Sequence, residues 1–513
     1  MRFKAELLGI ESGGPHIVTL SKDDAYELGV RGGERVKLHF NKKEVYAIVN
    51  VVTKSVQKGI LGIYDEMMKI EKINEGEYID VEVAEFPESL HFLQNKLKKR
   101  KLNSIEILEI VKDVVRGNLS DTEISAFITA LEINGLDVEE TTSLTMAMVE
   151  TGKTLNIGKT PICDKHSIGG VPGDKSTLLI VPIIASAGLT IPKTSSRAIT
   201  SASGTADRAE VLMPVDLEIN EMKYVVEKTN GCIVWGGALE LAPADDRFIQ
   251  IEYPLSIDPL LLPSIMAKKK AVGANYLALD IPTGRGAKVK TIGDAELLAK
   301  DFMELGRKLG IKTHSVITFG EQPIGHAIGP ALEAKEAWSV LQGDLKIFDL
   351  VDKSIHICSL IFGMAGIGVA GLALDILKRG KAEKKMREII YHQGGNSEIK
   401  IDDIKVGTHF LELKSETDGH IMWLNNQILV EISRAAGAPR YKGSGILVHK
   451  KLGEKVKKNE TILTIVSEKT TQGHNVEKIL NEVKPFFIGT SQEIIIHTIL
   501  DIPQTKKTFI FER

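Results

Sequence analysis

The amino-acid sequence predicts an α/β protein with a helical domain, a large mixed α/β sheet domain, and a small β-rich domain at each end. Three observations predict this fold. Short β-type runs separated by glycine or charged turns fill residues 1–85, and the apolar periodicity becomes helical over residues 104–152. Between residue 160 and about residue 413, β-type runs alternate with helical patterns, which is typical of a largely parallel sheet covered by helices.

A chain of 513 residues is too long for one hydrophobic core, so we expect several packed units. We predict a β-rich N-terminal domain over residues 1–85, a helical domain over residues 86–158 that is completed by about residues 244–274, an α/β domain over residues 159–415 that this helical segment interrupts, and a C-terminal α+β domain over residues 416–513. In such a sheet the active-site loops follow the carboxyl ends of the strands.

Local patterns predict the individual elements. Ser120 followed by Glu123 is a capping-box pattern and predicts the start of a helix, and Gly152 stands where a later helix would end. Apolar and β-branched runs predict strands at residues 35–40, 45–52, 178–184, 276–281, 419–423 and 445–450.

The bulk composition excludes several function classes. With 43% hydrophobic residues, 26% charged residues and a formal charge of −3, the chain has the composition of an ordinary soluble globular protein and not of a whole-chain nucleic-acid binder. Three widely spaced cysteines support neither a disulfide framework nor a zinc site, and no histidine or carboxylate spacing suggests a catalytic metal. The N-terminus lacks the apolar segment of a signal peptide. We therefore expect a cytoplasmic protein without a metal or a cofactor.

Three segments carry competing interpretations. Residues 357–374 are eighteen residues without a charge, but four glycines and the lack of an aromatic belt favour a buried helix over a membrane span. Residues 366–371 match a dinucleotide fingerprint, yet no acidic strand end follows about twenty residues later, so close helix packing is favoured over a nicotinamide site. The basic run at residues 96–101 is interpreted as solvated helix surface rather than as a contact patch.

Two segments rich in small and hydroxylated residues carry the main functional signal. Residues 193–207 are small, hydroxylated or charged with one exception, and they follow an apolar run. Residues 164–177 contain Lys165 and Ser167 beside a Gly-Gly turn. Small residues let the backbone approach an anion closely, while hydroxyls and helix N-terminal N–H groups supply donors. The natural interpretation is a phosphate site built from both segments.

These segments resemble a known family. The pattern Lys165-His166-Ser167-x-Gly169-Gly170, together with Ser195-x-Arg197 and Gly204-Thr205-x-Asp207, is similar to the phosphate-binding and signature segments of the thymidine and pyrimidine nucleoside phosphorylases. The likeness extends to Ala126-Phe127, residues 144–148, Gly394-Gly395 and residues 435–438, and it covers roughly residues 88–500.

Departures from that pattern indicate which branch of the family the sequence resembles. Ser264 and Lys268-Lys269 are kept, although the segment around Ser264 is about two residues shorter than the family pattern. Pro282 replaces a lysine that thymidine phosphorylases carry. These differences and the extra N-terminal domain resemble the archaeal AMP phosphorylases, a branch of transferases that convert AMP and phosphate to adenine and ribose 1,5-bisphosphate. CMP and UMP are further candidate substrates, and a homodimer or larger homo-oligomer is implied.

The resemblance implies roles for individual residues. Asp258 would protonate the departing purine, and its carboxyl would need a raised pKa from partial desolvation. Lys165, Ser167 and Thr205 would hold the attacking phosphate, and Lys288 adds a cation suited to a substrate with a 5′-phosphate. The residues expected to contact the nucleotide are Gly170, Ser196, Arg197, Ala198, Ile199, Thr200, Ser201, Thr205, Ser264 and Lys288.

Alternatives remain open at this point. Asp258 precedes a proline and could cap a helix, Lys288 could be a solvated loop lysine, and His166 could shape its loop rather than act as a base. The competing functions are a phosphorylase of unphosphorylated pyrimidine nucleosides and a noncatalytic nucleotide sensor. The partners expected are a nucleotide and phosphate, and neither nucleic acid nor a membrane. Closure of the cleft between the helical and α/β domains is a further hypothesis.

Overall fold

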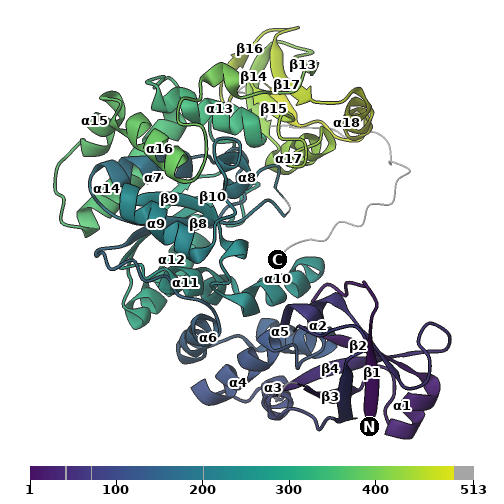
Figure 1. The fold of residues 1–513 in the computed structure, drawn as a ribbon. Coiled ribbons are helices and arrows are strands. Elements are labelled where there is room, and N and C mark those ends of the chain that lie inside the picture. The colour runs from purple at the N-terminus through teal and green to yellow at the C-terminus, as the bar shows by residue number, and fades with distance from the viewer. Residues whose placement is uncertain (15, 41–42, 71, 200, 490–513) are drawn as a thin grey trace.

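The computed structural model describes residues 1–513 except residues 15, 41–42, 71, 200 and 490–513. Figure 1 shows a barrel and a group of helices at one end of the molecule, a central sheet covered by helices, and a β-rich region at the other end. This arrangement confirms the predicted α/β fold class with its helical part and its two terminal β-rich parts.

The N-terminal strands close into a barrel in the order β1-β5-β2-β4-β3-β6. Alternate side chains such as Phe3, Leu38 and Leu61 point inward and are almost fully buried, which is the period of two that the sequence shows. The elements are β1 (Arg2–Leu7), β2 (Ile17–Ser21), α1 (Lys22–Leu28), β3 (Arg35–Phe40), β4 (Lys43–Val52), β5 (Ile60–Ile63), α2 (Asp65–Ile70) and β6 (Tyr78–Val83).

Six helices pack into a bundle next to the barrel. Capping boxes start three of them, at Asn103, Ser120 and Asp137, so the predicted start at Ser120 is confirmed. The bundle core includes Phe127 and Phe248, which belong to segments far apart in the sequence. The helices are α3 (Glu88–Leu97), α4 (Ser104–Val115), α5 (Asp121–Asn134), α6 (Val138–Glu150), α10 (Pro243–Leu255) and α11 (Leu261–Ala271).

The basic run 96–101 is not all solvated surface, as we had expected. Lys96 is buried, and its ammonium group lies 2.7 Å from the buried Glu140 carboxylate. The sequence around Lys96 could not predict this ion pair, because Glu140 belongs to a different helix, α6.

The central sheet is parallel wherever its strands pair, as predicted. β10 (Tyr276–Thr283) lies between β7 (Cys163–Ser167) and β11 (Lys312–Phe319), and β8 (Ile191–Ser195) pairs with β9 (Gly231–Trp235). A bridge between Ile162 and Thr190 places β7 beside β8. Helices cover the strands: α7 (Thr177–Ser186), α8 (Thr205–Ala209), α9 (Ile219–Thr229), α12 (Ile292–Leu309), α13 (Pro330–Leu341), α14 (Phe348–Met364), α15 (Leu372–Lys378) and α16 (Lys381–His392), with short 3₁₀ turns η1 (Gly236–Ala238) and η2 (Ile401–Asp403).

Two sequence predictions in this region were wrong. Residues 178–184 form the buried helix α7 and not a strand, because a short run that is apolar on every side has no period that separates the two. Residues 357–374 are not one buried helix, since α14 ends at Met364 and a loop leads to α15.

The glycines at residues 366–371 lie in that loop, and added Cβ atoms at Gly366, Gly368 and Gly371 would meet nothing within 4 Å. Neither close helix packing nor a dinucleotide site after a strand describes this segment, because helix α14 precedes it. Among the described residues no helix is both long enough and apolar enough to cross a membrane.

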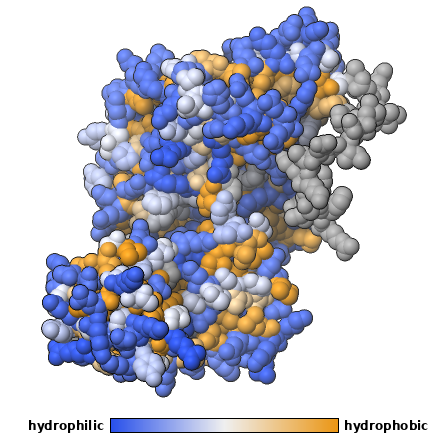
Figure 2. Space-filling model, turned by 90° about the vertical axis from the view of Figure 1, so that its right-hand side faces the viewer, coloured by the Kyte–Doolittle hydropathy of each residue, from blue (hydrophilic) through white to orange (hydrophobic). Residues whose placement is uncertain are grey.

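The C-terminal region contains two small antiparallel sheets. One has the order β12-β15-β17-β13 and the other the order β16-β14-β18. The elements are β12 (Ala327–Ile328), β13 (His409–Lys414), β14 (Gly419–Leu424), α17 (Asn426–Ala435), β15 (Gly445–Val448), β16 (Lys455–Val456), β17 (Thr461–Ser467), α18 (Thr470–Glu482) and β18 (Phe486–Gly489). The face of the molecule in Figure 2 is mostly hydrophilic with scattered apolar patches, as the composition predicts.

Candidate active site

The two segments singled out in the sequence meet at one edge of the central sheet. β7 ends at Ser167 and β8 ends at Ser195, and the two strands run parallel beside each other. The segments that follow them therefore start from the same carboxyl edge. Gly170 has a φ of +89°, and a Cβ there would collide with the backbone nitrogen of Lys288. The loop after β7 therefore also contacts the loop after β10.

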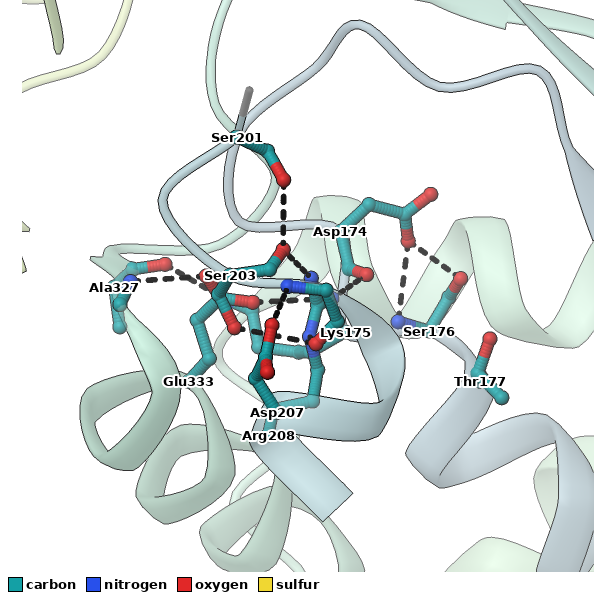
Figure 3. A network of polar contacts seen from close by, with 12 residues as sticks. Asp174, Lys175, Ser176, Thr177, Ser201, Ser203, Asp207, Arg208, Ala327 and Glu333 are labelled. Atoms are coloured by element: carbon teal, nitrogen blue, oxygen red, sulfur yellow. Dashed lines mark hydrogen bonds and ion pairs between the residues drawn. The ribbon is translucent and has the colours of Figure 1, made fainter. Parts of the chain in front are cut away.

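Arg208 joins these two segments. It lies on α8, donates hydrogen bonds to the carbonyls of Asp174, Ser203 and Gly204, and forms a 3.0 Å ion pair with Glu333. Figure 3 shows Asp174–Thr177 from the first segment lying next to Ser203, Asp207 and Arg208 from the second. The two segments are thus held together by direct contacts, and not merely by their place in the sheet.

Asp207 folds the second segment onto the N-terminus of α8. Its carboxylate accepts the N–H groups of Ala198 at 2.7 Å and Gly204 at 2.8 Å. An added Cβ at Gly204 would lie 2.6 Å from the Ala198 nitrogen, so this close approach requires glycine. Thr205, a predicted phosphate ligand, is the first residue of α8, and helix N-termini in general favour negative charge.

Lys165 and Ser167 sit over a buried network of charges. The Lys165 ammonium lies 3.1 Å from Ser176 Oγ and 3.4 Å from Thr177 Oγ1. Burial lowers the pKa of Lys165, while the carboxylates of Asp174 and Asp280 oppose that shift. Ser167 Oγ donates to the Asp280 carboxylate at 2.6 Å, so a carboxylate fixes the position of this hydroxyl oxygen.

Sequence reasoning missed the central cation of this network. Lys353 on α14 is buried, and its ammonium lies 2.7 Å from Asp280 and 3.1 Å from Asp174. Burial alone would lower the pKa of Lys353, but these two carboxylates raise it. Thr318 also donates to Asp280, at 2.6 Å. The one available signal was Asp280 itself, a charge inside an apolar strand; nothing in the helical pattern marks Lys353.

Arg197 makes its side-chain contacts next to its own loop. Its guanidinium group lies 2.7 Å from Glu210 and 3.0 Å from Asp216, and it lies 5.0 Å from the centre of the Trp235 ring. These partners occupy the guanidinium, so the side chain holds the loop in place. Ser196 and Ile199 are exposed, while Ala198 and Ser201 are half-buried. Thr200 lies outside the described residues.

The candidate acid comes from the helical bundle. Asp258 lies between α10 and α11, and its carboxylate is 3.4 Å from the Lys288 ammonium in the loop after β10. The side chains of Asp258 and Lys288 are 48% and 55% exposed. Burial raises the pKa of Asp258, the nearby Lys288 ammonium lowers it, and Asp245 raises it further. The N-cap residue of α11 is Leu260, so Asp258 does not cap this helix with its side chain. The Asp258 backbone carbonyl accepts a hydrogen bond from the Leu261 N–H, while its carboxylate lies beside Lys288.

Helix α11 carries two further residues that the sequence analysis named. Ser264 is half-buried in the first turns of α11, and the Lys269 ammonium further along pairs with buried Asp164 at 2.8 Å. His166 is largely enclosed, and burial together with the nearby Lys269 and Lys193 holds its pKa well below the ordinary value. A neutral imidazole fits a residue that shapes its loop. Among the described residues no group of three histidines, cysteines or carboxylates could hold a metal ion.

Comparisons with known proteins find relatives over nearly the whole chain. The helical bundle domain of a glycosyl transferase family matches residues 90–152, and the α/β domain of that family matches residues 159–366. An AMP phosphorylase from Thermofilum pendens is 48% identical over 490 residues, which cover 95% of each chain. One from Pyrococcus furiosus is 45% identical over 494 residues, 95% of this chain and 98% of the relative.

A solved structure shares the fold alone. Anthranilate phosphoribosyltransferase from Thermus thermophilus superposes with a TM-score of 0.51 at 17% identity, and the match covers 59% of this chain and 99% of that chain.

Proposed function

The chain belongs to the AMP phosphorylase family, and we propose that it cleaves the N-glycosidic bond of AMP with inorganic phosphate to give adenine and ribose 1,5-bisphosphate. One observation carries the proposal. The buried Lys165 and the half-buried Ser167 lie at the same sheet edge as the N-terminus of α8, and the loop that packs against Gly170 brings Lys288 to the carboxylate of Asp258.

The attacking phosphate is proposed to bind Lys165, Ser167 and Thr205. Lys165 would supply a positive charge, and Ser167 would supply a hydroxyl whose oxygen Asp280 holds in place. Thr205 would bring the N-terminus of α8 to the phosphate. The buried ions beneath them are paired before substrate arrives, so little reorganisation is needed when the anion binds. The one change required is that the Ser167 hydroxyl turns from Asp280 and donates to a phosphate oxygen instead.

The proposed chemical step balances without a cofactor or a metal. A phosphate oxygen forms the new bond to C1′ of the ribose as the bond from C1′ to the base nitrogen breaks, and the electron pair of that bond leaves with the base. Asp258, in its protonated form, gives its proton to the departing adenine. Holding both reactants against the anomeric carbon supplies much of the rate enhancement.

Lys288 is proposed to link nucleotide recognition to this acid. In the ligand-free protein its ammonium lies beside Asp258 and lowers the pKa of that carboxyl. A 5′-phosphate carries more charge than one carboxylate and competes for the ammonium. Binding of AMP then removes the cation from Asp258 and favours the protonated carboxyl that catalysis needs. Gly170, Ser264 and the segment from Ser196 to Ser201 are proposed to complete the nucleotide contacts.

An activity panel tests this proposal. Base release from AMP, CMP, UMP, thymidine and uridine is measured with and without phosphate. We expect phosphate-dependent release of adenine from AMP, with ribose 1,5-bisphosphate as the second product. Preference for thymidine over every nucleotide would select the pyrimidine nucleoside phosphorylase, and binding of AMP without turnover would select the nucleotide sensor. A homodimer or larger homo-oligomer, and a cytoplasmic location, are also proposed, and light scattering tests the assembly.

A further inference from the structure

Helix α17 of the C-terminal region contacts both loops that are proposed to hold the nucleotide. At its first residue, Asn426 donates from Nδ2 to the Gly320 carbonyl at 2.9 Å, and an added Cβ at Gly286 would lie 3.2 Å from the Asn426 Cβ. Just before the helix, the Trp423 ring lies 4.1 Å from the Arg285 guanidinium carbon. This end of α17 therefore packs on the loop 284–289, which carries Lys288.

The other end of α17 contacts the loop after β8. Arg434 donates a hydrogen bond to the Ile199 carbonyl at 3.0 Å. Ala202, from the same loop, is only 2% exposed and belongs to the apolar cluster that contains Ile428, Leu429 and Ile432 of α17. This loop, comprising residues 196–199 and 201–204, thus inserts a side chain into the core of the C-terminal region.

The two contacts are separated by a fixed length of helix. Asn426 and Arg434 are eight residues apart, which is roughly 12 Å along an α-helix. Between its two ends the helix packs Ile428, Leu429 and Ile432 into the apolar cluster of the C-terminal region. We therefore expect its two ends to move together. Lys165 and Ser167 lie on β7 itself, and Asp174 in the loop after β7 contacts Arg208 and Lys353.

We propose that α17 is a bracket that sets the distance between the two nucleotide-contacting loops, and that Arg434 and Trp423 are positioning residues for the nucleotide. This inference rests on the proposed function, because it takes these loops to be the ones that bind AMP. It assigns to the C-terminal region a direct part in substrate recognition. Two of the three proposed phosphate ligands, Lys165 and Ser167, lie on β7 and not on these two loops, so loss of the bracket is expected to raise the KM for AMP more than the KM for phosphate.

Single substitutions at the two ends test the bracket separately. Arg434→Ala removes the hydrogen bond to the Ile199 carbonyl, and we expect the KM for AMP to rise about fivefold. Trp423→Ala removes the ring under Arg285 and is expected to act in the same direction, while Trp423→Phe keeps an aromatic face and restores the KM. The matched control is Glu431→Ala, an exposed position on α17 one turn from Arg434.

Hydrogen exchange of the ligand-free variants gives a readout that does not depend on activity. We expect Arg434→Ala to speed exchange in residues 196–204 and Trp423→Ala to speed it in residues 284–289, while Glu431→Ala changes neither. Unchanged exchange in both loops would overturn the bracket, and so would faster exchange with an unaltered KM for AMP or an equal rise in the KM for phosphate. Failure of the unsubstituted protein to turn over AMP would instead overturn the proposed function, and the exchange result would still judge the bracket.

Discussion

The phosphate side and the acid side of the candidate site are built differently. On the phosphate side Lys165 is 3% exposed and Asp280 is fully buried, and both belong to a network of ion pairs and hydroxyls. On the acid side Asp258 and Lys288 are about half exposed and share one contact of 3.4 Å between two parts of the molecule. Under the proposed function, the phosphate side needs little change beyond a turn of the Ser167 hydroxyl, whereas the acid side changes its one ion pair when the nucleotide binds.

This difference also bears on the closure hypothesis. A reaction through an oxocarbenium-like sugar benefits from excluding water, and the exposed acid side is the half that must move to do so. The helical bundle carries Asp258, and the central sheet carries Lys288, so motion between them would change that one contact first.

The largest effect is expected from breaking the acid side. Asp258→Asn keeps the shape of the side chain but cannot give a proton to the departing base. We expect kcat for AMP phosphorolysis to fall by about 10²–10⁴, with binding of AMP retained. Steady-state kinetics and equilibrium titration with AMP measure the two quantities. An unchanged kcat would remove Asp258 from the chemical step.

Breaking the phosphate side is expected to act on folding as much as on catalysis. Lys353→Met leaves Asp174 and Asp280 buried without their shared cation, and removal of one partner of a buried ion pair costs about 3–5 kcal/mol. Denaturant unfolding measures the loss, and Lys378→Met at an exposed helical position is the control. A loss no larger than that of the control would show that the network is not buried as described.

A third experiment sharpens the contrast through pH. Burial, with a contribution from Asp258, raises the pKa of Glu252 to about 7 from 4.5. Between these values the folded protein keeps a proton that the unfolded chain has lost, so the free energy of unfolding should fall as pH rises from 4.5 to 7, by up to about 3 kcal/mol. Denaturant unfolding at several pH values checks this. Glu252→Gln should flatten the slope, and a slope that persists in that variant belongs to other groups.

The smallest effect is expected from removing the single cation of the acid side. Lys288→Met should raise the KM for AMP about tenfold, because one charge-assisted contact to the 5′-phosphate is lost. It also removes the cation that lowers the pKa of Asp258 in the free enzyme, so the alkaline limb of the kcat/KM profile should move to higher pH. Lys290→Met, two residues away and exposed, is the control. A limb that moves to lower pH would contradict the pairing of Lys288 with Asp258.

The sequence predicts the site wherever chemistry and local pattern coincide. Ser167, Gly170 and Thr205 stand in segments whose small and hydroxylated residues mark them, and the parallel strands place both segments at one edge of the sheet. Lys353 could not be predicted, because its role depends on Asp174 and Asp280, which lie far from it in sequence. Buried pairs of this kind appear only when the chain is folded.

Two other outcomes have the same origin. The guanidinium of Arg197 is held by Glu210 and Asp216, which no local pattern connects to it. The apolar run at residues 178–184 fits either a helix or a strand. It forms a helix because it connects the parallel strands β7 and β8, and such a connection usually contains a helix.

A crystal structure with AMP and sulfate, as an unreactive analogue of phosphate, tests the central claim most directly. We predict sulfate on Lys165, Ser167 and Thr205, the 5′-phosphate on Lys288, and the Asp258 carboxyl within hydrogen-bonding distance of a nitrogen of the adenine. We also expect a changed angle between the helical bundle and the central sheet relative to the ligand-free protein. Sulfate bound away from these three residues, or adenine placed out of reach of Asp258, would contradict the account.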